Sequence, residues 1–365
     1  MPTRVLILSA GIGEGHDLPA RMLADGLVRR RPDAEVTVVD GLAAMGRLSL
    51  LIADDGSDFM FEEANWLFDL TYLLIARFPP TRALTRALTH RLGSGGLLRL
   101  IAERRPDVIV STYPGVTEAL GHLRARGRIA VPVVSAITDL AGLHYWAHPG
   151  VDLHLITEQE SADEVQRIAP GSPFVCVRGL ISPAFERPVD PETARRELDL
   201  PDAGPVIVVS GGGWAVGDLA GSARAALAAD PGATVLALCG RSEEKRAALR
   251  RDVPDEPRLR VMGFTDRMGD VLAAADVLVH STAGLTVFEA RLRGCRVVSY
   301  GWGVSHIRLN NAAYRRFGLA EVAGGRAQLD AALRRALAAP REPDVAYADR
   351  PDAAAEVLAL SDMRA

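Results

Sequence analysis

The stretch that decides the fold is Val5-Leu-Ile-Leu-Ser-Ala-Gly-Ile-Gly-Glu-Gly-His16, close to the start of the chain. A short run of β-prone residues, Val5–Leu8, passes directly into a glycine-rich turn, and an amphipathic stretch near Leu18–Arg30 follows. Glycine lets the backbone turn tightly and approach a ligand closely, and the helix N-terminus beyond the turn favours an anionic group. The order strand, loop, helix predicts the first unit of a parallel α/β sheet.

The alternation of short β-rich runs with longer amphipathic stretches continues in two series. The first series of expected strands comprises Val5–Leu8, Glu35–Val39, Val108–Val110, Val133–Ala136 and Leu153–Ile156. The second comprises Val206–Val209, Val235–Leu238, Arg258–Met262, Val277–His280 and Arg296–Tyr300. This pattern predicts an α/β fold with two Rossmann-like, doubly wound domains.

Prolines mark the junction between the two series. No single regular element can span Ile181–Pro205, because this stretch carries Pro183, Pro188, Pro191, Pro201 and Pro205. We therefore expect a first domain at 1–185 and a second at 186–340. A short tail helix is expected within 341–365, and its packing back onto the first domain is one arrangement left open.

The composition is that of a globular protein, with 48% hydrophobic and 24% charged residues in a chain of 365. The formal net charge of −4 argues against a general nucleic-acid binder. The three cysteines, Cys176, Cys239 and Cys295, lack metal-ligand spacing, so we expect reduced core residues and no metal site. The apolar runs are too short for a signal peptide or for a bilayer span of about 20 residues, which predicts a cytoplasmic location with peripheral membrane attachment left open.

The loop after the first expected strand brings Gly13, Gly15 and His16 to the carboxyl edge of the sheet. A dinucleotide-binding loop is disfavoured, because His16 occupies the third glycine position of that motif. A histidine at this edge suits proton transfer at neutral pH. The alternative is a histidine that only caps the helix or contacts backbone.

The second series offers two further loops at strand ends. Gly212 and Gly213, in the run Ser210-Gly-Gly-Gly-Trp214, clear space for a phosphate or for the opposing domain, although turn geometry alone also demands glycines. Ser281, Thr282, Ala283 and Gly284 precede a helix and are expected to offer backbone N–H groups and hydroxyls to a diphosphate.

Two side chains near these loops suit the remainder of a nucleotide. Glu289, in the helix after the third loop, is placed to accept hydrogen bonds from ribose hydroxyls, with a solvated helix carboxylate as the alternative. Phe264 and the neighbouring Thr265 end another strand and are expected to offer a wall and backbone atoms to a base. For Phe264, a plain core position is the alternative.

The order of these motifs resembles the monogalactosyldiacylglycerol synthase and processive diacylglycerol glucosyltransferase family, with a more distant similarity to the glycosyltransferase that completes lipid II. The resemblance covers roughly residues 4 to 320. Its markers are the turn ending in His16, Thr138-Asp139-Leu140, His144, Trp146–Asp152, Gly211–Gly213, Gly263-Phe264, Met268, Ala283-Gly284 and Glu289-Ala290. The resemblance implies a GT-B fold, in which two Rossmann-like domains face a central cleft.

The resemblance also implies a reaction: inverting transfer of a hexose from a UDP-sugar to a lipid hydroxyl such as that of diacylglycerol. No cofactor besides the donor and no metal at the diphosphate is implied. His16 falls on the family's proposed general base, and Asp139 on a position that orients this base or holds the acceptor. Uracil contacts are implied at Phe264 and Thr265, diphosphate contacts at 281–284, and a ribose contact at Glu289.

One departure from the family concerns the donor sugar. His306 and Ile307 occupy the place of a Gln-Glu or Gln-Gln pair that reads sugar hydroxyls, while Asn310 aligns with the family's following Asn. An altered hexose, a deoxysugar and a different nucleotide all remain open, because sugar hydroxyls need matched partners. His306 is either a replacement ligand or an exposed loop histidine.

The acceptor side is expected in residues 66–92. If Pro80 starts a helix, Arg82, Arg86 and His90 form one stripe, while Leu84 and Leu88 lie about 200° away. Such a helix suits contact with anionic lipid, and the aromatic and aliphatic residues at 66–75 suit an interfacial anchor. The alternative is a core-packed helix with a solvated arginine face.

Three other functions stay open from the sequence. One is a glycosyltransferase that uses a UDP- or TDP-sugar on a soluble hydrophobic aglycone. Another is a nucleotide-sugar 2-epimerase, which requires acid and base groups around the sugar that we do not identify. The third is a non-catalytic nucleotide-sugar-binding partner, for which loss of His16 would have no effect.

Overall fold

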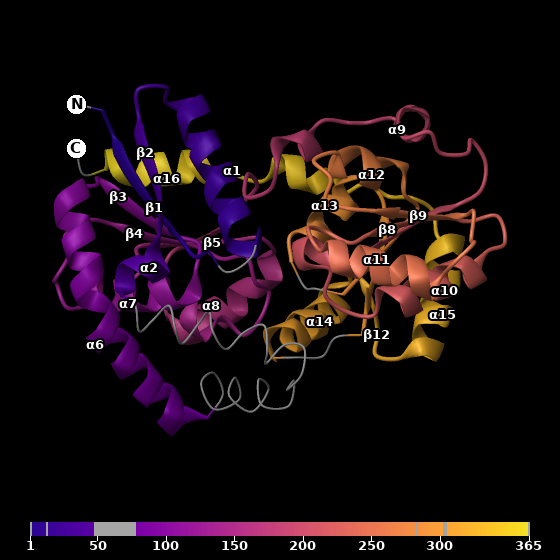
Figure 1. Cartoon of the computed structure of the whole chain (residues 1–365). Coiled ribbons are helices and arrows are strands. Elements are labelled where there is room, and N and C mark those ends of the chain that lie inside the picture. The colour runs from indigo at the N-terminus through magenta and orange to yellow at the C-terminus, as the bar shows by residue number, and fades with distance from the viewer. Residues whose placement is uncertain (1, 12–13, 47–77, 282–283, 302–304, 364–365) are drawn as a thin grey trace. The chain divides into compact units, whose positions relative to one another are not determined.

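The computed structural model describes residues 2–11, 14–46, 78–281, 284–301 and 305–363, with Glu14, Trp214, Ser305 and His306 described by backbone alone. The chain forms two compact units. One consists of Met1–Ser182, Val304–Leu309 and Arg350–Ala365, and the other of Pro183–Gly303 and Asn310–Asp349. Each is a parallel sheet flanked by helices (Figure 1).

The first unit contains a six-stranded, fully parallel sheet in the order β2-β1-β3-β4-β5-β6. Its strands are β1 (Arg4–Ser9), β2 (Glu35–Asp40), β3 (Val108–Ser111), β4 (Val133–Ala136), β5 (Leu153–Ile156) and β6 (Phe174–Cys176). Its helices are α1 (Glu14–Arg30), α2 (Gly41–Met45), α6 (Pro79–Arg104), α7 (Pro114–Ala125), α8 (Ala162–Ile168) and α16 (Ala353–Asp362), with short 3-10 turns η2 (Leu143–Tyr145) and η3 (Gln159–Ser161).

Alternate residues of β1 face opposite sides of this sheet, as the period of two in a strand dictates. Val5 and Ile7 pack with helices α1 and α16 on one face. Leu6 and Leu8 pack with α2, α6 and α7 on the other. A strand that is buried on both faces needs apolar residues at nearly every position, which explains the continuous run in the sequence.

The second unit contains another fully parallel six-stranded sheet, in the order β12-β11-β10-β7-β8-β9. Its strands are β7 (Val206–Ser210), β8 (Thr234–Leu238), β9 (Leu259–Met262), β10 (Val277–His280), β11 (Arg296–Tyr300) and β12 (Glu321–Ala323). Its helices are α9 (Pro191–Glu197), α10 (Leu219–Ala229), α11 (Glu243–Asp252), α12 (Met268–Ala274), α13 (Thr286–Leu292), α14 (Ser305–Phe317, whose first turn belongs to the first unit) and α15 (Arg326–Ala338); the 3-10 turns are η4 (Pro183–Glu186), η5 (Gly212–Trp214) and η6 (Val345–Asp349).

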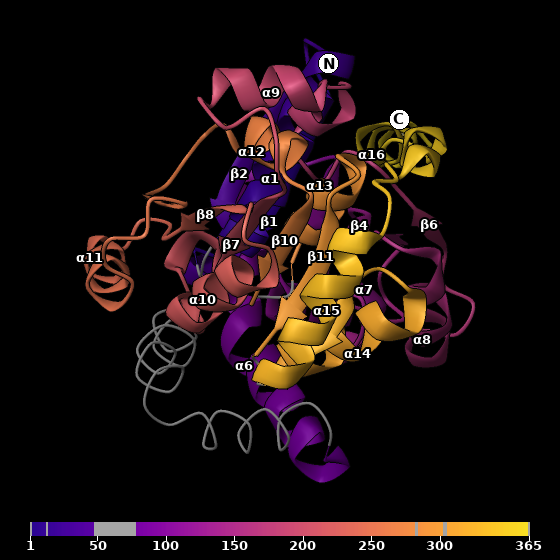
Figure 2. The same ribbon diagram turned by 90° about the vertical axis from the view of Figure 1, so that its right-hand side faces the viewer.

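Helices α10 and α15 lie side by side on one face of the second sheet (Figure 2). Their apolar residues pack on Ile207 and Val209 of β7 and on Val277 and Val279 of β10. Asp218 caps α10, since its carboxylate accepts from the Gly221 N–H at 2.7 Å. The helix therefore begins next to the glycine-rich loop that follows β7.

The order of the strands reverses once in each sheet. The reversal lies between β1 and β3 in the first unit, and between β7 and β10 in the second. In open α/β sheets, ligands bind beyond the carboxyl ends of the strands at this point, because the connections there leave in opposite directions. The topology therefore directs attention to the loops after β1, β3, β7 and β10.

Candidate functional site

In the first unit, His16 and Thr112 come together at the carboxyl ends of the neighbouring strands β1 and β3. His16 lies in the first turn of α1, and its Nδ1 is 3.0 Å from the carbonyl oxygen of Thr112. The Thr112 hydroxyl donates in return to the carbonyl oxygen of His16 at 3.0 Å. The two residues thus hold each other through two hydrogen bonds.

This arrangement fixes the tautomer of the imidazole. A carbonyl oxygen only accepts hydrogen bonds, so Nδ1 must carry the proton in the bond to Thr112. In a neutral ring the lone pair is then on Nε2, which is the tautomer that a general base acting through Nε2 requires. The alternative of a histidine that contacts backbone therefore describes Nδ1 of His16.

Two aromatic side chains border the His16 ring. The Tyr113 ring meets it edge to face at a centroid distance of 5.1 Å, and the Trp146 ring lies tilted at 5.8 Å. Burial, with a smaller effect of Asp40, raises the pKa of Tyr113 to about 12, so its phenol stays protonated. The Trp146 indole donates to Asp139 at 2.8 Å. Asp139, expected to orient His16 or hold the acceptor, thus acts on the indole that packs against His16.

In the second unit, the loops after β7 and β10 are fastened to each other. The Ser281 N–H donates to the Ser210 carbonyl at 3.2 Å, and the Ser281 hydroxyl donates to the Val216 carbonyl. Ser281 is buried, so its hydroxyl serves to hold the two loops together. A Cβ on Gly211 would lie 2.4 Å from the Val216 carbonyl oxygen, which explains a glycine at that position.

Tyr314 of α14 holds the end of the third loop. Its phenol oxygen accepts from the Gly284 N–H at 3.0 Å and lies 3.3 Å from the Gly284 carbonyl. Tyr314 is buried, so this loop rests on a fixed support. The predicted residues Thr282 and Ala283, like Gly13 of the first unit, lie outside the described residues.

Glu289 is a buried carboxyl rather than a solvated one. It lies one turn into α13 with 5% of its surface exposed, which rules out the alternative of a solvent-facing helix residue. Burial raises its pKa from the ordinary 4.5 to about 7. No described side chain forms an ion pair with it. Such a carboxyl suits a ligand whose polar groups become buried beside it.

The strand ends next to the glycine-rich loop carry an exposed aromatic ring. Phe264 is 52% exposed, so the alternative of a core position is wrong. The Cζ atom of Arg241 lies over this ring, 3.8 Å from its centroid. The Thr265 hydroxyl accepts from the Arg267 N–H at 3.0 Å and so shapes the turn before α12. The sequence interpretation missed Arg241, although it follows a clear strand in the run Cys-Gly-Arg241.

The residues expected to read the sugar lie in α14. Asn310 and Ile307 are buried, and Asn311 accepts from the Ser299 hydroxyl at 2.6 Å. Burial explains an apolar side chain at position 307. The side chain of His306 lies outside the described part of the chain.

Helix α6 is present where the sequence predicts it, but its arginine stripe faces inward. Arg86 and His90 contact Glu118 of α7 at 2.8 Å and 2.9 Å, and Arg82 lies 3.0 Å from His144. Burial alone would raise the pKa of Glu118, but the bond to His90 and the charge of Arg86 outweigh it and hold this pKa below its ordinary value. The alternative of a helix with a solvated arginine face is therefore wrong.

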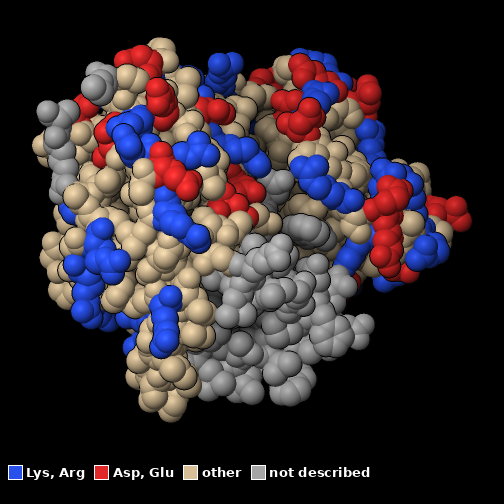
Figure 3. All heavy atoms as spheres, turned by 60° about the vertical axis from the view of Figure 1, so that its left-hand side comes forward, with Lys and Arg blue, Asp and Glu red and all other residues tan. Residues whose placement is uncertain are grey.

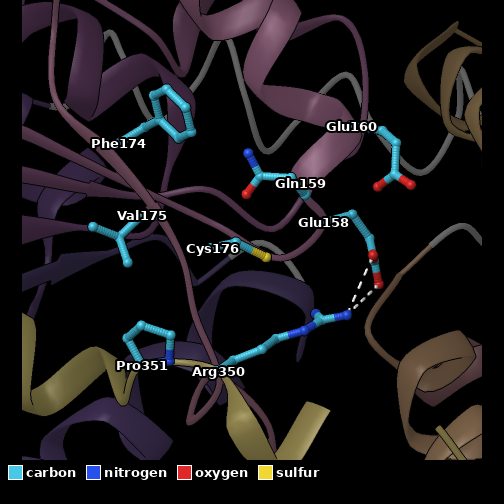
Figure 4. A pocket seen from close by; sticks show the side chains of 8 residues that line it. All are labelled: Glu158, Gln159, Glu160, Phe174, Val175, Cys176, Arg350 and Pro351. Carbon is cyan, nitrogen blue, oxygen red and sulfur yellow. Dashed lines mark hydrogen bonds and ion pairs between the residues drawn. The ribbon is translucent and has the colours of Figure 1, made fainter. Parts of the chain in front are cut away.

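A separate pocket of about 560 Å³ lies beside the carboxyl ends of β5 and β6 (Figure 4). Arg350 spans it, with an ion pair to Glu158 at 3.2 Å and a hydrogen bond to the Thr157 carbonyl. None of the predicted site residues lines it. Its lining consists of Glu158, Gln159, Glu160, Phe174, Val175, Cys176, Arg350 and Pro351. We regard Arg350 as the anchor of the chain where it returns to the first unit.

The described residues show neither a metal-binding cluster nor a membrane-spanning helix. They contain no group of three or more His, Cys, Asp or Glu side chains arranged to hold a metal ion. None of the described helices is both long and apolar enough to cross a membrane.

Comparison with known proteins supports the sequence interpretation. The family model for monogalactosyldiacylglycerol (MGDG) synthase matches residues 21–173. The chain resembles the MGDG synthase family. The processive diacylglycerol beta-glucosyltransferase of Bacillus subtilis is 24% identical over 81% of this chain and 77% of its own length. The protein of the same name from Staphylococcus epidermidis is 24% identical over 55% of this chain and 51% of its own, so the match spans about half of that relative.

Solved structures decide the fold. The crystal structure of MurG from Acinetobacter baumannii covers 99% of this chain and 100% of its own, with a TM-score of 0.56 and 15% identity. At this identity the likeness concerns the fold alone. The predicted GT-B class, with two parallel α/β domains, is confirmed.

Proposed function

We propose that this chain is an inverting glycosyltransferase that transfers a hexose from a UDP-sugar to the hydroxyl of a lipid such as diacylglycerol. Similarity to the diacylglycerol glucosyltransferases and to MGDG synthase supports the lipid acceptor. The observation that carries the proposal is the hydrogen bond of His16 Nδ1 to the Thr112 carbonyl, because it places the lone pair of the neutral imidazole on Nε2, at the switch point of the first sheet.

In the proposed reaction, Nε2 of His16 takes the proton of the acceptor hydroxyl as that oxygen attacks the anomeric carbon. The new glycosidic C–O bond forms while the bond from the anomeric carbon to the diphosphate oxygen breaks, and UDP leaves with the electron pair. Asp139 contributes indirectly, since it holds the Trp146 indole against the His16 ring. Restricted rotation of the imidazole keeps the base in one orientation.

We assign the donor to the loops of the second unit. The diphosphate is assigned to the turn at Gly212 and Gly213 and to the 281–284 loop, just before α13, where the dipole of the helix favours the charge that develops as UDP departs. Glu289 takes the ribose hydroxyls, and the backbone at Phe264 and Thr265 takes the uracil. His306 and Asn310 remain candidates for the sugar hydroxyls. The proposal includes no metal ion and no cofactor besides the donor.

We further propose that the protein attaches peripherally to the cytoplasmic face of a membrane through the N-terminal half of α6. Phe78, Leu84 and Leu88 are all exposed on this half of the helix. Arg91 is exposed as well, and residues 78–91 contain no acidic side chain; the protruding lower end in Figure 3 shows blue but no red atoms. Exposed apolar groups with basic neighbours and no acidic ones suit contact with anionic lipid. The predicted anchor at 66–75 lies outside the described residues.

The first test is exchange of His16 for Ala in the purified protein, assayed with UDP-hexoses and diacylglycerol vesicles. Loss of the base should slow transfer by a factor of about 10² to 10⁴ and leave UDP affinity unchanged. The matched control is His122→Ala, in the last turn of α7, which should retain transfer.

Three outcomes contradict the proposal. Wild-type transfer by the His16→Ala variant would remove the base assignment. Glycosylation of a soluble aglycone without any transfer to diacylglycerol would show that the acceptor is not a lipid. Release of an epimerised UDP-sugar without an acceptor would show that the protein is an epimerase and not a transferase.

A further inference from the structure

The interface between helices α6 and α7 of the first unit contains a pair of stacked histidines (Figure 1). The rings of His90, on α6, and His122, on α7, have centroids 3.7 Å apart and planes inclined by 14°. The lone pair of an imidazole nitrogen lies in the plane of its ring, and two nearly parallel planes do not converge on one metal ion. The chemistry that this histidine stack offers is therefore the uptake and release of protons.

A buried carboxylate favours the charged form of His90. Glu118 only accepts hydrogen bonds, so His90 donates to it from Nε2 at 2.9 Å, and Arg86 donates to its other oxygen at 2.8 Å. The imidazolium form of His90 is thus paired with a carboxylate. The Nε of Arg86 is buried and has no hydrogen-bond partner among the described residues. Because a buried donor without a partner costs free energy, this interface has little stability in reserve.

The surroundings of His122 oppose a proton. Burial lowers the pKa of His122 below its ordinary value of 6.5, and the charges of His90 and Arg126 lower it further, while Glu118 opposes them. A proton on both rings would place two imidazolium groups face to face at 3.7 Å. Since the pKa is lower in the closed interface than in the open one, the stability of the interface is full above pH 6.5 and falls with the pH below it.

The third histidine at this interface does not relieve the stack of its charge. His148 precedes β5 and lies directly on the backbone of α7, where a Cβ on Gly121 would be 2.5 Å from the His148 Cγ. Its Nδ1 accepts from the Gly150 N–H at 2.9 Å. Burial above all, with smaller effects of neighbouring cations, lowers its pKa to about 4. His148 therefore stays neutral above about pH 5.

We propose that the histidine stack is a pH-sensitive switch, which holds α6 against α7 near neutral pH and opens when His122 takes up a proton. The charged and titratable groups that face the stack are His90 and Arg86 of α6, Glu118 and Arg126 of α7, and His148 of the turn before β5. Glu118 is already bonded to Arg86 and His90, so a second proton meets mainly positive neighbours. The switch makes the position of α6, the helix assigned to the membrane, depend on pH, and this consequence alone rests on the proposed function.

The experiment is hydrogen exchange of the full chain at about pH 7.5 and about pH 5.5, expressed as protection factors so that the intrinsic pH dependence of exchange cancels. In the wild type, protection of residues 82–93 should fall on acidification by up to about tenfold, the limit for one group of ordinary pKa 6.5 that binds no proton in the closed interface. His122→Phe keeps a flat ring that takes up no proton, so this fall should be smaller by the same factor. His122→Lys carries a permanent charge and should show the low protection already at about pH 7.5.

Arg99→Ala, at an exposed position in the same helix, is the control and should follow the wild type at both pH values. The burial of His148 also lowers stability at acid pH, but it does so in every variant alike. The difference between the wild type and His122→Phe is therefore the quantity that reports the switch.

An equal fall of protection in the wild type and in His122→Phe would overturn the inference. Wild-type protection of α6 in His122→Lys at neutral pH would overturn it as well, and so would a fall in β1 and β3 as large as that in α6. None of these results involves donor or lipid, so each leaves the proposed function standing. A lack of binding to lipid vesicles would instead remove the membrane role of α6 and leave the switch.

Discussion

Glu289 combines burial with a titration close to neutral pH. The carboxyl gives up water on folding, and no described side chain compensates it with an opposite charge. In the proposed site the ionised form accepts hydrogen bonds from the ribose. The residue therefore lowers the stability of the free protein at the pH where it serves binding, a common compromise at functional sites.

Exchange of Glu289 for Gln should expose this compromise. Since burial raises the folded pKa from 4.5 to about 7, the folded state binds the proton more tightly than the unfolded state does. The free energy of unfolding of the wild type, relative to that of Glu289→Gln, should therefore be highest below pH 4.5. It should fall as the pH rises towards 7, by on the order of 3 kcal/mol. Urea denaturation of both proteins across this range measures it.

Two further observations complete that test. Glu244→Gln, at an exposed position in α11, should show no such pH-dependent difference. UDP affinity should rise with pH through 7 in the wild type and stay low in Glu289→Gln. A stability difference that is constant across the pH range would contradict the assignment.

At this scale, residue types beside strand ends could be predicted, but their partners could not. His16 stood out because it follows a strand and a glycine-rich turn. Thr112, which fixes its tautomer, is 96 positions away in the chain and has no local signature. For Asp139 the sequence predicts that it orients His16 or holds the acceptor, and the structure adds its bond to the Trp146 indole. Contacts of this kind depend on strand order, which periodicity does not encode.

At the scale of elements, α6 shows how one buried carboxylate orients a helix. The helical period separates the arginine and leucine stripes, but either stripe can face the protein. Glu118 on α7 decides the outcome, because an unpaired carboxylate at this depth would cost several kcal/mol. Arg86 and His90 therefore turn inward, and Leu84 and Leu88 remain outside.

Exchange of both Leu84 and Leu88 for Asp should weaken membrane attachment without affecting the donor site. Each leucine that leaves the lipid forfeits about 1.5 to 3 kcal/mol, so co-sedimentation with anionic, diacylglycerol-containing vesicles should fall by at least about tenfold. UDP binding, measured on the same preparation, should not change. Equal co-sedimentation of the variant and the wild type would show that α6 does not contact lipid.

The ten expected strands are all present, and the eight of them that lie inside the two sheets are largely apolar runs that are almost completely buried. The two strands that the sequence analysis missed, β6 and β12, lie at sheet edges and contain three residues each. An edge strand has one neighbour and needs less apolar sequence, so it leaves a weaker pattern. The fold class could therefore be predicted, but the short edge strands β6 and β12 could not.

At the scale of the whole molecule, the first unit is assembled from segments at both ends of the chain. Helix α16 packs on α1, and Val357 is fully buried in the core that covers β1 and β3. Arg178 and Asp352 form a parallel β-bridge, which joins the segment after β6 to the start of α16. The last helix is thus part of the first core.

Exchange of Val357 for Ala should destabilise the first unit selectively. The cavity left by the two methyl groups should cost about 2 kcal/mol. Hydrogen exchange should accelerate in α1, β1 and β3, while β7 and β10 keep their protection. Met363→Ala, at a residue that is 75% exposed, should behave like the wild type. Equal acceleration in both sheets would indicate that the units unfold together.

The place of α16 also has a consequence during synthesis. A ribosome completes the whole second unit before it makes residues 353–362, so the second unit can fold first although it comes later in the chain. Until α16 arrives, one face of the first sheet lacks part of its cover and exposes Val108 and Val110. The nascent first unit is therefore the part of this protein that most needs protection by chaperones.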